Sequence, residues 1–329
     1  MQRSLTDPWT LGGLPIPNRV VLAPLAGIGN WFVRLQARRY GAGLVVSEMV
    51  SSFAIHYENK RTLTELLRIE DAERTAGAGG PVSIQLFGQD PAVMRHAAAV
   101  VADRGADLID LNMGCPVPKV MKTGAGAALL KDPDAAVAVA KAAREGSNLP
   151  VTVKLRAEGA GVARRLAEEA GVAGITFHPR TIKVHHKGVP DYELAAQLVQ
   201  DLDVPVIVSG GMQGADHVRW VFEHTGCAAV MLARGALGNP WLFEEVLGTR
   251  AVAPAPEEVV AEWLWVLERA VEHLGPDRAA SYLRKFHPWY VERLNGTAEL
   301  KNRLQLAATI DEQRAVIRGL DPVLSSPAA

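Results

Sequence analysis

Eight short apolar runs recur between about residue 19 and residue 248, and each is followed by a turn and an Ala-rich amphipathic stretch. The runs are Val20–Ala23, Leu44–Val46, Val82–Leu86, Leu108–Leu111, Val151–Leu155, Gly174–Phe177, Val206–Val208 and Ala228–Leu232. Their spacing of about 30 residues is close to one βαβ unit, and such runs suit parallel strands covered on both faces. The pattern predicts an α/β fold of the (β/α)8 TIM barrel type, because a doubly wound sheet is harder to extend to eight uniform units.

Helix signals support this pattern. Asp90-Pro91 and Asp132-Pro133 precede amphipathic stretches and predict helix starts. Gly105, Gly146 and Gly171 follow such stretches and predict helix ends.

The alternation stops at Ala251–Pro256, a Pro- and Ala-rich segment typical of a linker. From Glu257 to about Leu320, apolar residues recur at helical spacing without strand-like runs. We therefore predict a barrel over residues 1–250, followed by a small all-helical C-terminal domain over residues 251–329.

Composition limits the classes of function. With 35 Lys+Arg and 36 Asp+Glu, the net charge is −1, so a nucleic-acid surface must be a local patch. Only two cysteines occur, which excludes a disulfide framework. Residues 1–8 hold no apolar core of signal-peptide length, and no uncharged apolar run is long enough to span a membrane. We expect a cytoplasmic monomer.

Polar residues follow most of the predicted strands, at the face where such barrels hold their active sites. These segments are Pro24–Gly27, Gln85, Asn112–Pro116, Lys154 with Arg156, His178–Arg180, Ser209–Gly211 and Ala233–Gly235.

Two glycine-containing turns, Ser209–Gly211 and Arg234-Gly235, follow the seventh and eighth runs and precede helices. Backbone N–H groups in such turns can bind phosphate, and barrels often bind it at these two positions. An ordinary tight turn is the alternative at each position.

Lys154 lies in an otherwise apolar strand, where its charge must be paired or reach solvent. It is either a strand-end lysine or a cation that holds electron-rich ligand atoms. Cys115 lies on a Gly-Cys-Pro turn at the catalytic face, whereas Cys227 fits a buried core thiol. A nucleophile and a general acid are both open for Cys115. His178, His185 and His186 lack metal-ligand spacing, so we expect no metal.

Together these motifs resemble the dihydrouridine synthase family, whose members reduce uridine in the D-loop of tRNA with FMN. The B-type bacterial branch is most similar. The matching segments cover nearly the whole chain: Ala23–Gly27, Ser47–Val50, Gln85 with Phe87-Gly88, Asp110–Pro116, Lys122–Leu130, Val153–Arg156, His178–Thr181, Arg234–Trp241 and Leu283–Tyr290.

The resemblance implies a role for each matching position. Cys115 is the acid that protonates C5 of uracil, while hydride from FMN reaches C6, and NADPH or NADH reduces FMN. The FMN site comprises Pro24, Leu25, Ala26, Gln85, Lys154 and His178, with Ser209, Gly210, Gly211, Ala233 and Arg234 at the phosphate. The tRNA site comprises Asn112, Arg180, Lys119, Lys122, Arg284 and Lys285.

Further cations are candidates for tRNA binding: Arg34, Arg38, Arg39, Lys183, Lys187, Arg293, Lys301 and Arg303. A solvated helix face is the alternative for the helical group. The chain departs from the family pattern in Ser209 for Asn, Ala233 for Gly, Pro179 for Gly, and a shortened segment over residues 157–173.

Two other functions fit parts of the sequence. A small-molecule FMN oxidoreductase of the dihydroorotate dehydrogenase type shares the barrel and a similar cysteine turn, but the helical domain and His178–Arg180 argue against it. A tRNA-binding protein without catalysis does not explain Cys115 and Lys154.

Overall fold

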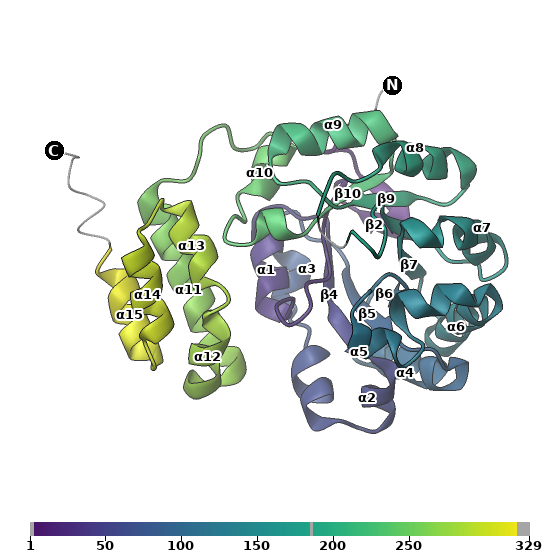
Figure 1. Cartoon of the computed structure of the whole chain (residues 1–329), viewed down its shortest axis with the longest axis horizontal. Coiled ribbons are helices and arrows are strands. Elements are labelled where there is room, and N and C mark those ends of the chain that lie inside the picture. Colours follow the sequence, from purple (N-terminus) through teal and green to yellow (C-terminus); the bar gives the residue numbers. More distant parts are fainter. Residues whose placement is uncertain (1–2, 185–186, 321–329) are drawn as a thin grey trace. The chain divides into compact units, whose positions relative to one another are not determined.

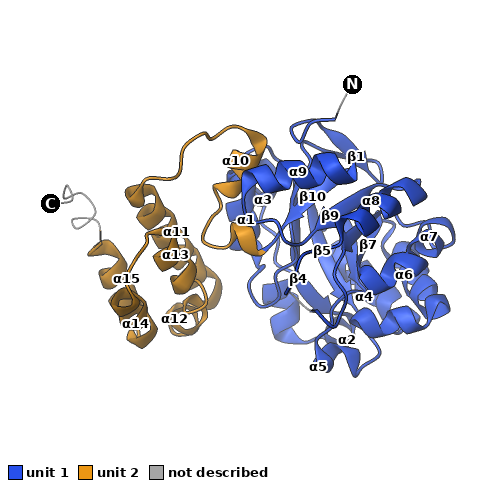
Figure 2. Ribbon diagram, turned by 45° about the horizontal axis from the view of Figure 1, so that its top comes forward, with its two compact units in different colours: residues 1–233 blue, residues 234–329 orange. Residues whose placement is uncertain are grey.

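The computed structural model describes residues 3–184 and 187–320. The chain divides into two compact units, residues 1–233 and residues 234–329 (Figure 2). The second unit starts ahead of the segment 251–256, where the sequence places the end of the barrel domain. The functional division at residue 250 stays a prediction.

The first unit contains a closed barrel of eight parallel strands in the order β10-β3-β4-β5-β6-β7-β8-β9 (Figure 1). Each of the eight predicted runs forms one strand, so the predicted barrel is confirmed and the doubly wound alternative is wrong. The strands are β3 Val20–Leu22, β4 Leu44–Ser51, β5 Val82–Phe87, β6 Leu108–Asn112, β7 Val151–Arg156, β8 Gly174–His178, β9 Val206–Ser209 and β10 Ala229–Leu232.

Helices surround the barrel. They are α1 Trp31–Arg39, α2 Ser52–His56, η1 Thr62–Leu66, α3 Ala72–Thr75, α4 Pro91–Asp103, α5 Pro118–Met121, η2 Gly126–Lys131, α6 Pro133–Ser147, η3 Ala157–Gly159, α7 Ala160–Glu168, α8 Tyr192–Asp201 and α9 Ala215–Thr225.

The two predicted helix starts are confirmed, because the carboxylates of Asp90 and Asp132 accept backbone N–H groups of α4 and α6. The predicted helix end at Gly146 is wrong, since this residue lies inside α6. A Cβ there would clash with the Arg95 carbonyl of α4, so the glycine permits close packing of the two helices. Asn148, at φ 56°, ends α6 instead.

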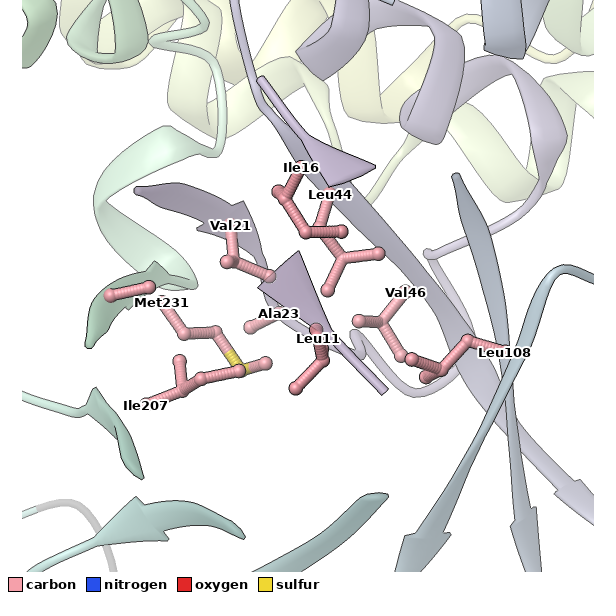
Figure 3. Packing of buried hydrophobic residues seen from close by; sticks show 10 residues of the cluster. Leu11, Ile16, Val21, Ala23, Leu44, Val46, Leu108, Ile207 and Met231 are labelled. Carbon is pink, nitrogen blue, oxygen red and sulfur yellow. The ribbon is translucent and has the colours of Figure 1, made fainter. Parts of the chain in front are cut away.

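A hairpin that the sequence analysis missed closes the amino-terminal end of the barrel. Strands β1 (Trp9–Leu11) and β2 (Leu14–Ile16) pair antiparallel, and Leu11 and Ile16 are fully buried. Figure 3 shows both side chains packed among the first residues of several barrel strands. The sequence did hold one sign of this hairpin: Gly12-Gly13 lies between apolar residues, and both glycines have positive φ in the structure. Because this hairpin covers the amino-terminal end of the barrel, an active site is expected at the opposite end, where the strands have their carboxyl ends.

The prediction that Arg34 and Arg38 belong to an RNA-binding surface is wrong. Both side chains are fully buried on α1. Arg34 Nε lies 2.6 Å from the buried Glu73 carboxylate, and Arg38 donates only to backbone carbonyl oxygens in the hydrogen bonds that the structure describes. These arginines therefore stabilise the fold, while their neighbour Arg39 is exposed.

The second unit is all-helical over residues 234–320, the described part, which confirms the predicted helical C-terminal region. It comprises η4 Arg234–Ala236, α10 Leu242–Leu247, α11 Pro256–Leu274, α12 Pro276–Leu283, α13 His287–Arg293, α14 Ala298–Leu306 and α15 Ile310–Arg318. Trp263 of α11 stacks on Tyr290 of α13 in its core, with ring centroids 5.4 Å apart.

The buried His287 makes this unit sensitive to acid. Trp263 Nε1 donates to His287 Nδ1 at 3.2 Å, so that nitrogen must stay unprotonated. Burial lowers the pKa of His287 from 6.5 to about 4; the neighbouring Gln313 side chain opposes this shift, and Arg284 adds to it. Because the unfolded state binds the proton first, stability is complete above about pH 6.5 and falls between 6.5 and 4. The loss should reach about 3 kcal/mol.

Urea unfolding of the full chain, monitored by tryptophan fluorescence at pH 7 and pH 5, should show about 2 kcal/mol of this loss, because pH 5 still lies above the lowered pKa. The control is His287→Asn, which removes the titrating ring. Its stability should change less than that of the native chain over the same interval, and an equal change in both proteins would contradict the assignment.

Candidate active site

Five polar residues lie at or near the carboxyl ends of consecutive barrel strands. Gln85, Asn112, Lys154, His178 and Ser209 belong to β5, β6, β7, β8 and β9. Parallel pairing aligns Asn112 with Lys154 and Arg156 with His178. The fold therefore places these predicted site residues on one face of the barrel.

The Cys115 turn is tied to two of these strands by side-chain amides. Gln85 Oε1 accepts from Asn112 Nδ2 at 2.9 Å, and Asn112 Oδ1 accepts from the Cys115 backbone N–H at 2.9 Å. Ala127 N–H donates to the Cys115 carbonyl at 3.1 Å. Cys115 itself is a partly exposed free thiol. The hydrogen bonds thus fix the backbone of Cys115, a residue that is partly exposed to solvent.

Asn112 therefore has a structural partner on each side, which the sequence analysis did not foresee. Its predicted contact with substrate stays a prediction.

Lys154 is partly buried between strands, and no hydrogen bond or ion pair joins its ammonium to the residues that the structure describes. Burial lowers its pKa from 10.5 to about 8, while the nearby Asp110 carboxylate opposes this shift. A cation in this position can donate to an electron-rich ligand atom. The ligand-holding role of Lys154 stays a prediction.

His178 is buried beneath the turn that follows β9. Gly210, at φ +102°, lies so close to the imidazole that a Cβ would clash with its Cδ2. Tyr192 donates from its hydroxyl to the Gly210 carbonyl at 2.7 Å, and burial raises the pKa of Tyr192 to about 12. This tyrosine was missed by the sequence analysis, since nothing local to α8 connects it with the glycine turn.

The two predicted phosphate-binding turns lie ahead of helices but are separated from them by several residues. Gly210 and Gly211 both have positive φ, whereas α9 begins only at Ala215. Arg234-Gly235 lies in the short 3-10 helix η4, and α10 begins at Leu242. Both turns precede helices, as predicted, but several residues separate each turn from its helix, so any phosphate contact here would use amide groups of the turns.

Other predicted phosphate contacts are less directly supported. Ser209 is buried and donates to the Phe177 carbonyl at 3.4 Å. Ala233 follows β10 and is partly exposed, whereas Arg234 is exposed at the start of the second unit. Their phosphate contacts stay predictions.

The segment after β3 supplies the remaining predicted flavin contacts. Leu25 is buried, Pro24 partly buried and Ala26 exposed. Gly27 N–H donates to Glu48 Oε2 at 2.7 Å, which connects this segment to β4. The segment can present both apolar side chains and backbone groups to a planar ligand.

The predicted tRNA-binding residues differ in accessibility. Lys119, Lys122 and Lys285 are exposed, and Arg284 is partly buried. Arg180 is 6% exposed and donates to the Gly188 carbonyl at 2.7 Å, which joins the segment directly after β8 to Gly188. Lys183, Lys187, Lys301 and Arg303 are also exposed, and Arg293 is partly buried. Their contacts with RNA stay predictions.

The basic loop after β8 includes His185 and His186, which lie outside the described residues. Within residues 3–184 and 187–320, no group of three or more His, Cys, Asp or Glu side chains could hold a metal ion.

The model of the family described as dihydrouridine synthase (Dus) matches residues 21–324 of this chain. A tRNA-dihydrouridine synthase B from Xanthomonas axonopodis pv. citri is 34% identical, over 97% of this chain and 99% of its own length. The tRNA-dihydrouridine synthase B from Pseudomonas aeruginosa is 33% identical, over 94% of each chain.

Solved structures show the same barrel at lower identity. Morphinone reductase has a TM-score of 0.56 and 17% identity, over 79% of this chain and 93% of its own. The old yellow enzyme homologue from Zymomonas mobilis has a TM-score of 0.57 and 14% identity, over 77% and 95%. At these identities the comparison supports the fold alone.

Proposed function

The chain belongs to the dihydrouridine synthase family, and from this we propose that it is a flavin-dependent oxidoreductase that reduces uridine in the D-loop of tRNA to 5,6-dihydrouridine. The observation that carries the proposal is the accessible Cys115 on a turn tied to Gln85 and Asn112, on the same barrel face as Lys154. We propose the B-type activity because the similar proteins named above carry that name over nearly their full length.

The donors on this face fit FMN. Lys154 offers an ammonium without a described hydrogen-bond partner, and the turn Gly210-Gly211 brings main chain close to His178. Gln85, His178 and Lys154 would contact the isoalloxazine and ribityl portion, beside Pro24–Ala26. The turns at Ser209–Gly211 and Ala233-Arg234 would hold the phosphate. When bound, FMN supplies hydride for C6 of uracil and is reduced in turn by NADPH or NADH.

The chain supplies the proton and the geometry. Cys115 donates its thiol proton to C5 on the face of uracil opposite the flavin, and a solvent proton restores the thiol. Asn112 and Gln85 hold the Cys115 turn in place during this transfer. Exposed lysines, among them Lys119 and Lys122, would contact tRNA phosphates, and the target uridine must leave its stack to reach Cys115.

The lysine makes a testable contribution to flavin binding. Lys154→Met should weaken FMN affinity by about 10- to 100-fold, because one charge-assisted hydrogen bond is lost. Affinity in the native protein should also fall as pH rises through about 8, where burial places the pKa of Lys154. Titration of the flavin-free protein, followed by FMN fluorescence, measures both effects.

The matched control is Lys141→Met, which removes an exposed lysine from the outer helix α6. Its FMN affinity should match that of the native protein. Equal affinities for Lys154→Met and Lys141→Met would remove Lys154 from the proposed flavin site.

The cellular function is tested by mapping dihydrouridine in tRNA from a strain that lacks this chain. We expect one or more D-loop positions to remain uridine and to regain dihydrouridine when the intact chain is restored. Unchanged modification would favour either a tRNA-binding protein without catalysis or a flavin enzyme of small molecules such as dihydroorotate.

The exposed basic residues and a tRNA substrate support a cytoplasmic location. In the described residues, no helix is both long and apolar enough to cross a membrane. We propose a monomer as the working form.

A further inference from the structure

Asp110 is a buried carboxylate behind the proposed reaction site, with no role in the steps above. It lies on β6 and is 1% exposed. Its Oδ2 accepts from Gln85 Nε2 at 2.6 Å, and its Oδ1 accepts from Thr152 Oγ1 at 2.7 Å. Burial raises the pKa of Asp110, whereas these two hydrogen bonds and the Lys154 ammonium oppose the shift. These three polar groups favour the ionised carboxylate, against the burial that raises its pKa.

A carboxylate that accepts both of these hydrogen bonds gives the side-chain amides of Gln85 and Asn112 one orientation. Because a carboxylate only accepts hydrogen bonds, Gln85 must turn its NH2 group towards Asp110. Gln85 Oε1 then faces Asn112 and accepts from Asn112 Nδ2 at 2.9 Å. This leaves Asn112 Oδ1 facing the cysteine turn, where it accepts from the N–H groups of Gly114 and Cys115 at 3.2 and 2.9 Å.

The reverse orientation of the two amides is unfavourable, because it leaves no hydrogen-bond acceptor for the backbone N–H groups of Gly114 and Cys115. A flipped Gln85 would present NH2 to Asn112, which would have to flip as well. Asn112 would then present NH2 to two backbone N–H groups, and none of these groups can accept. The Asp110 carboxylate and the two backbone N–H groups therefore fix the same orientation from opposite ends, and a donor at position 110 would oppose the hydrogen bonds of the Cys115 turn.

We propose that Asp110 is a positioning residue that sets the amide orientations of Gln85 and Asn112 and thereby holds Cys115 in place. The proposal rests on the proposed function only for its effect on turnover, since the order of the turn can be measured without substrate. Asp110→Asn is nearly isosteric, but its neutral amide can present a donor to Gln85, so position 110 no longer enforces the orientation that the backbone N–H groups of the Cys115 turn require.

Amide hydrogen exchange of the full chain, read by mass spectrometry in peptides containing Gly114 and Cys115, tests the proposal. Asp110→Asn should exchange these amides about tenfold faster, the loss expected for one hydrogen bond. Its kcat at saturating tRNA should fall while it still binds FMN.

Two further variants separate orientation from general destabilisation. Thr152→Val removes the other donor to Asp110, so it should lower the melting temperature without speeding exchange at the Cys115 turn. In Asp110→Asn with Gln85→Glu, a carboxylate at position 85 accepts from both neighbours, so exchange should return to within about twofold of native.

Native exchange in Asp110→Asn, or equal acceleration in Thr152→Val, would overturn the proposal. Protected amides in a native protein that makes no dihydrouridine would instead reject the proposed function and leave the positioning role of Asp110 intact.

Discussion

Cys115→Ala should lower the rate of dihydrouridine formation by about 100- to 10,000-fold, the range expected when a general acid is removed. The methyl group cannot donate a proton to C5. Flavin binding and flavin reduction should persist, because the predicted flavin contacts lie on other residues. Nucleoside mass spectrometry of tRNA after single turnover measures product, and flavin absorbance measures reduction.

The second cysteine provides the control. Cys227 is fully buried, and burial raises the pKa of its thiol, so it stays a neutral core group. Cys227→Ala makes the same chemical change away from the proposed site and should keep near-native turnover. Full turnover in Cys115→Ala would remove this thiol as the acid, whereas equal losses in both variants would point to a general effect of cysteine removal.

Arg38→Met should destabilise the barrel unit by about 4 kcal/mol and lower the melting temperature by about 8–16 °C. The guanidinium is fully buried and donates to four backbone carbonyls, those of Glu73, Ala42, Gly79 and Pro81, at 2.5–2.8 Å. Methionine fills much of the same volume but leaves these acceptors without a donor. Thermal unfolding followed by circular dichroism measures the loss.

Arg39→Met is the matched control, because it removes an exposed arginine from the next position of the same helix. Its stability should change by no more than about 0.5 kcal/mol. Similar melting temperatures for the two variants would contradict the structural role of Arg38.

Strand positions were predictable because fully buried parallel strands need continuous apolar residues, and each of the eight runs became one strand. The side chains at their carboxyl ends followed from the fold. Lys154 could be singled out as a candidate because a lysine in an otherwise apolar strand must have its charge paired or solvated. Asp110 carried the same signal, but only the structure shows that its partners are Gln85 and Thr152.

The wrong predictions concern residues whose roles depend on contacts with parts of the chain that are distant in sequence. Arg34 and Arg38 were predicted to be surface charges because the sequence does not reveal that Glu73 and several backbone carbonyls lie next to them in the fold. The hairpin of β1 and β2 was missed because its strands are short, although Gly12-Gly13 marked its turn. Gly146 read as a helix end because the packing of α4 against α6 is not visible locally.

The most direct test of the central claim combines the purified, FMN-loaded chain with NADPH and an unmodified tRNA transcript. Nucleoside mass spectrometry then measures the product. We predict that D-loop uridine is converted to dihydrouridine, and that free dihydroorotate is not turned over. A tRNA that remains unmodified while NADPH reduces the flavin, or turnover of dihydroorotate independent of tRNA, would contradict the account.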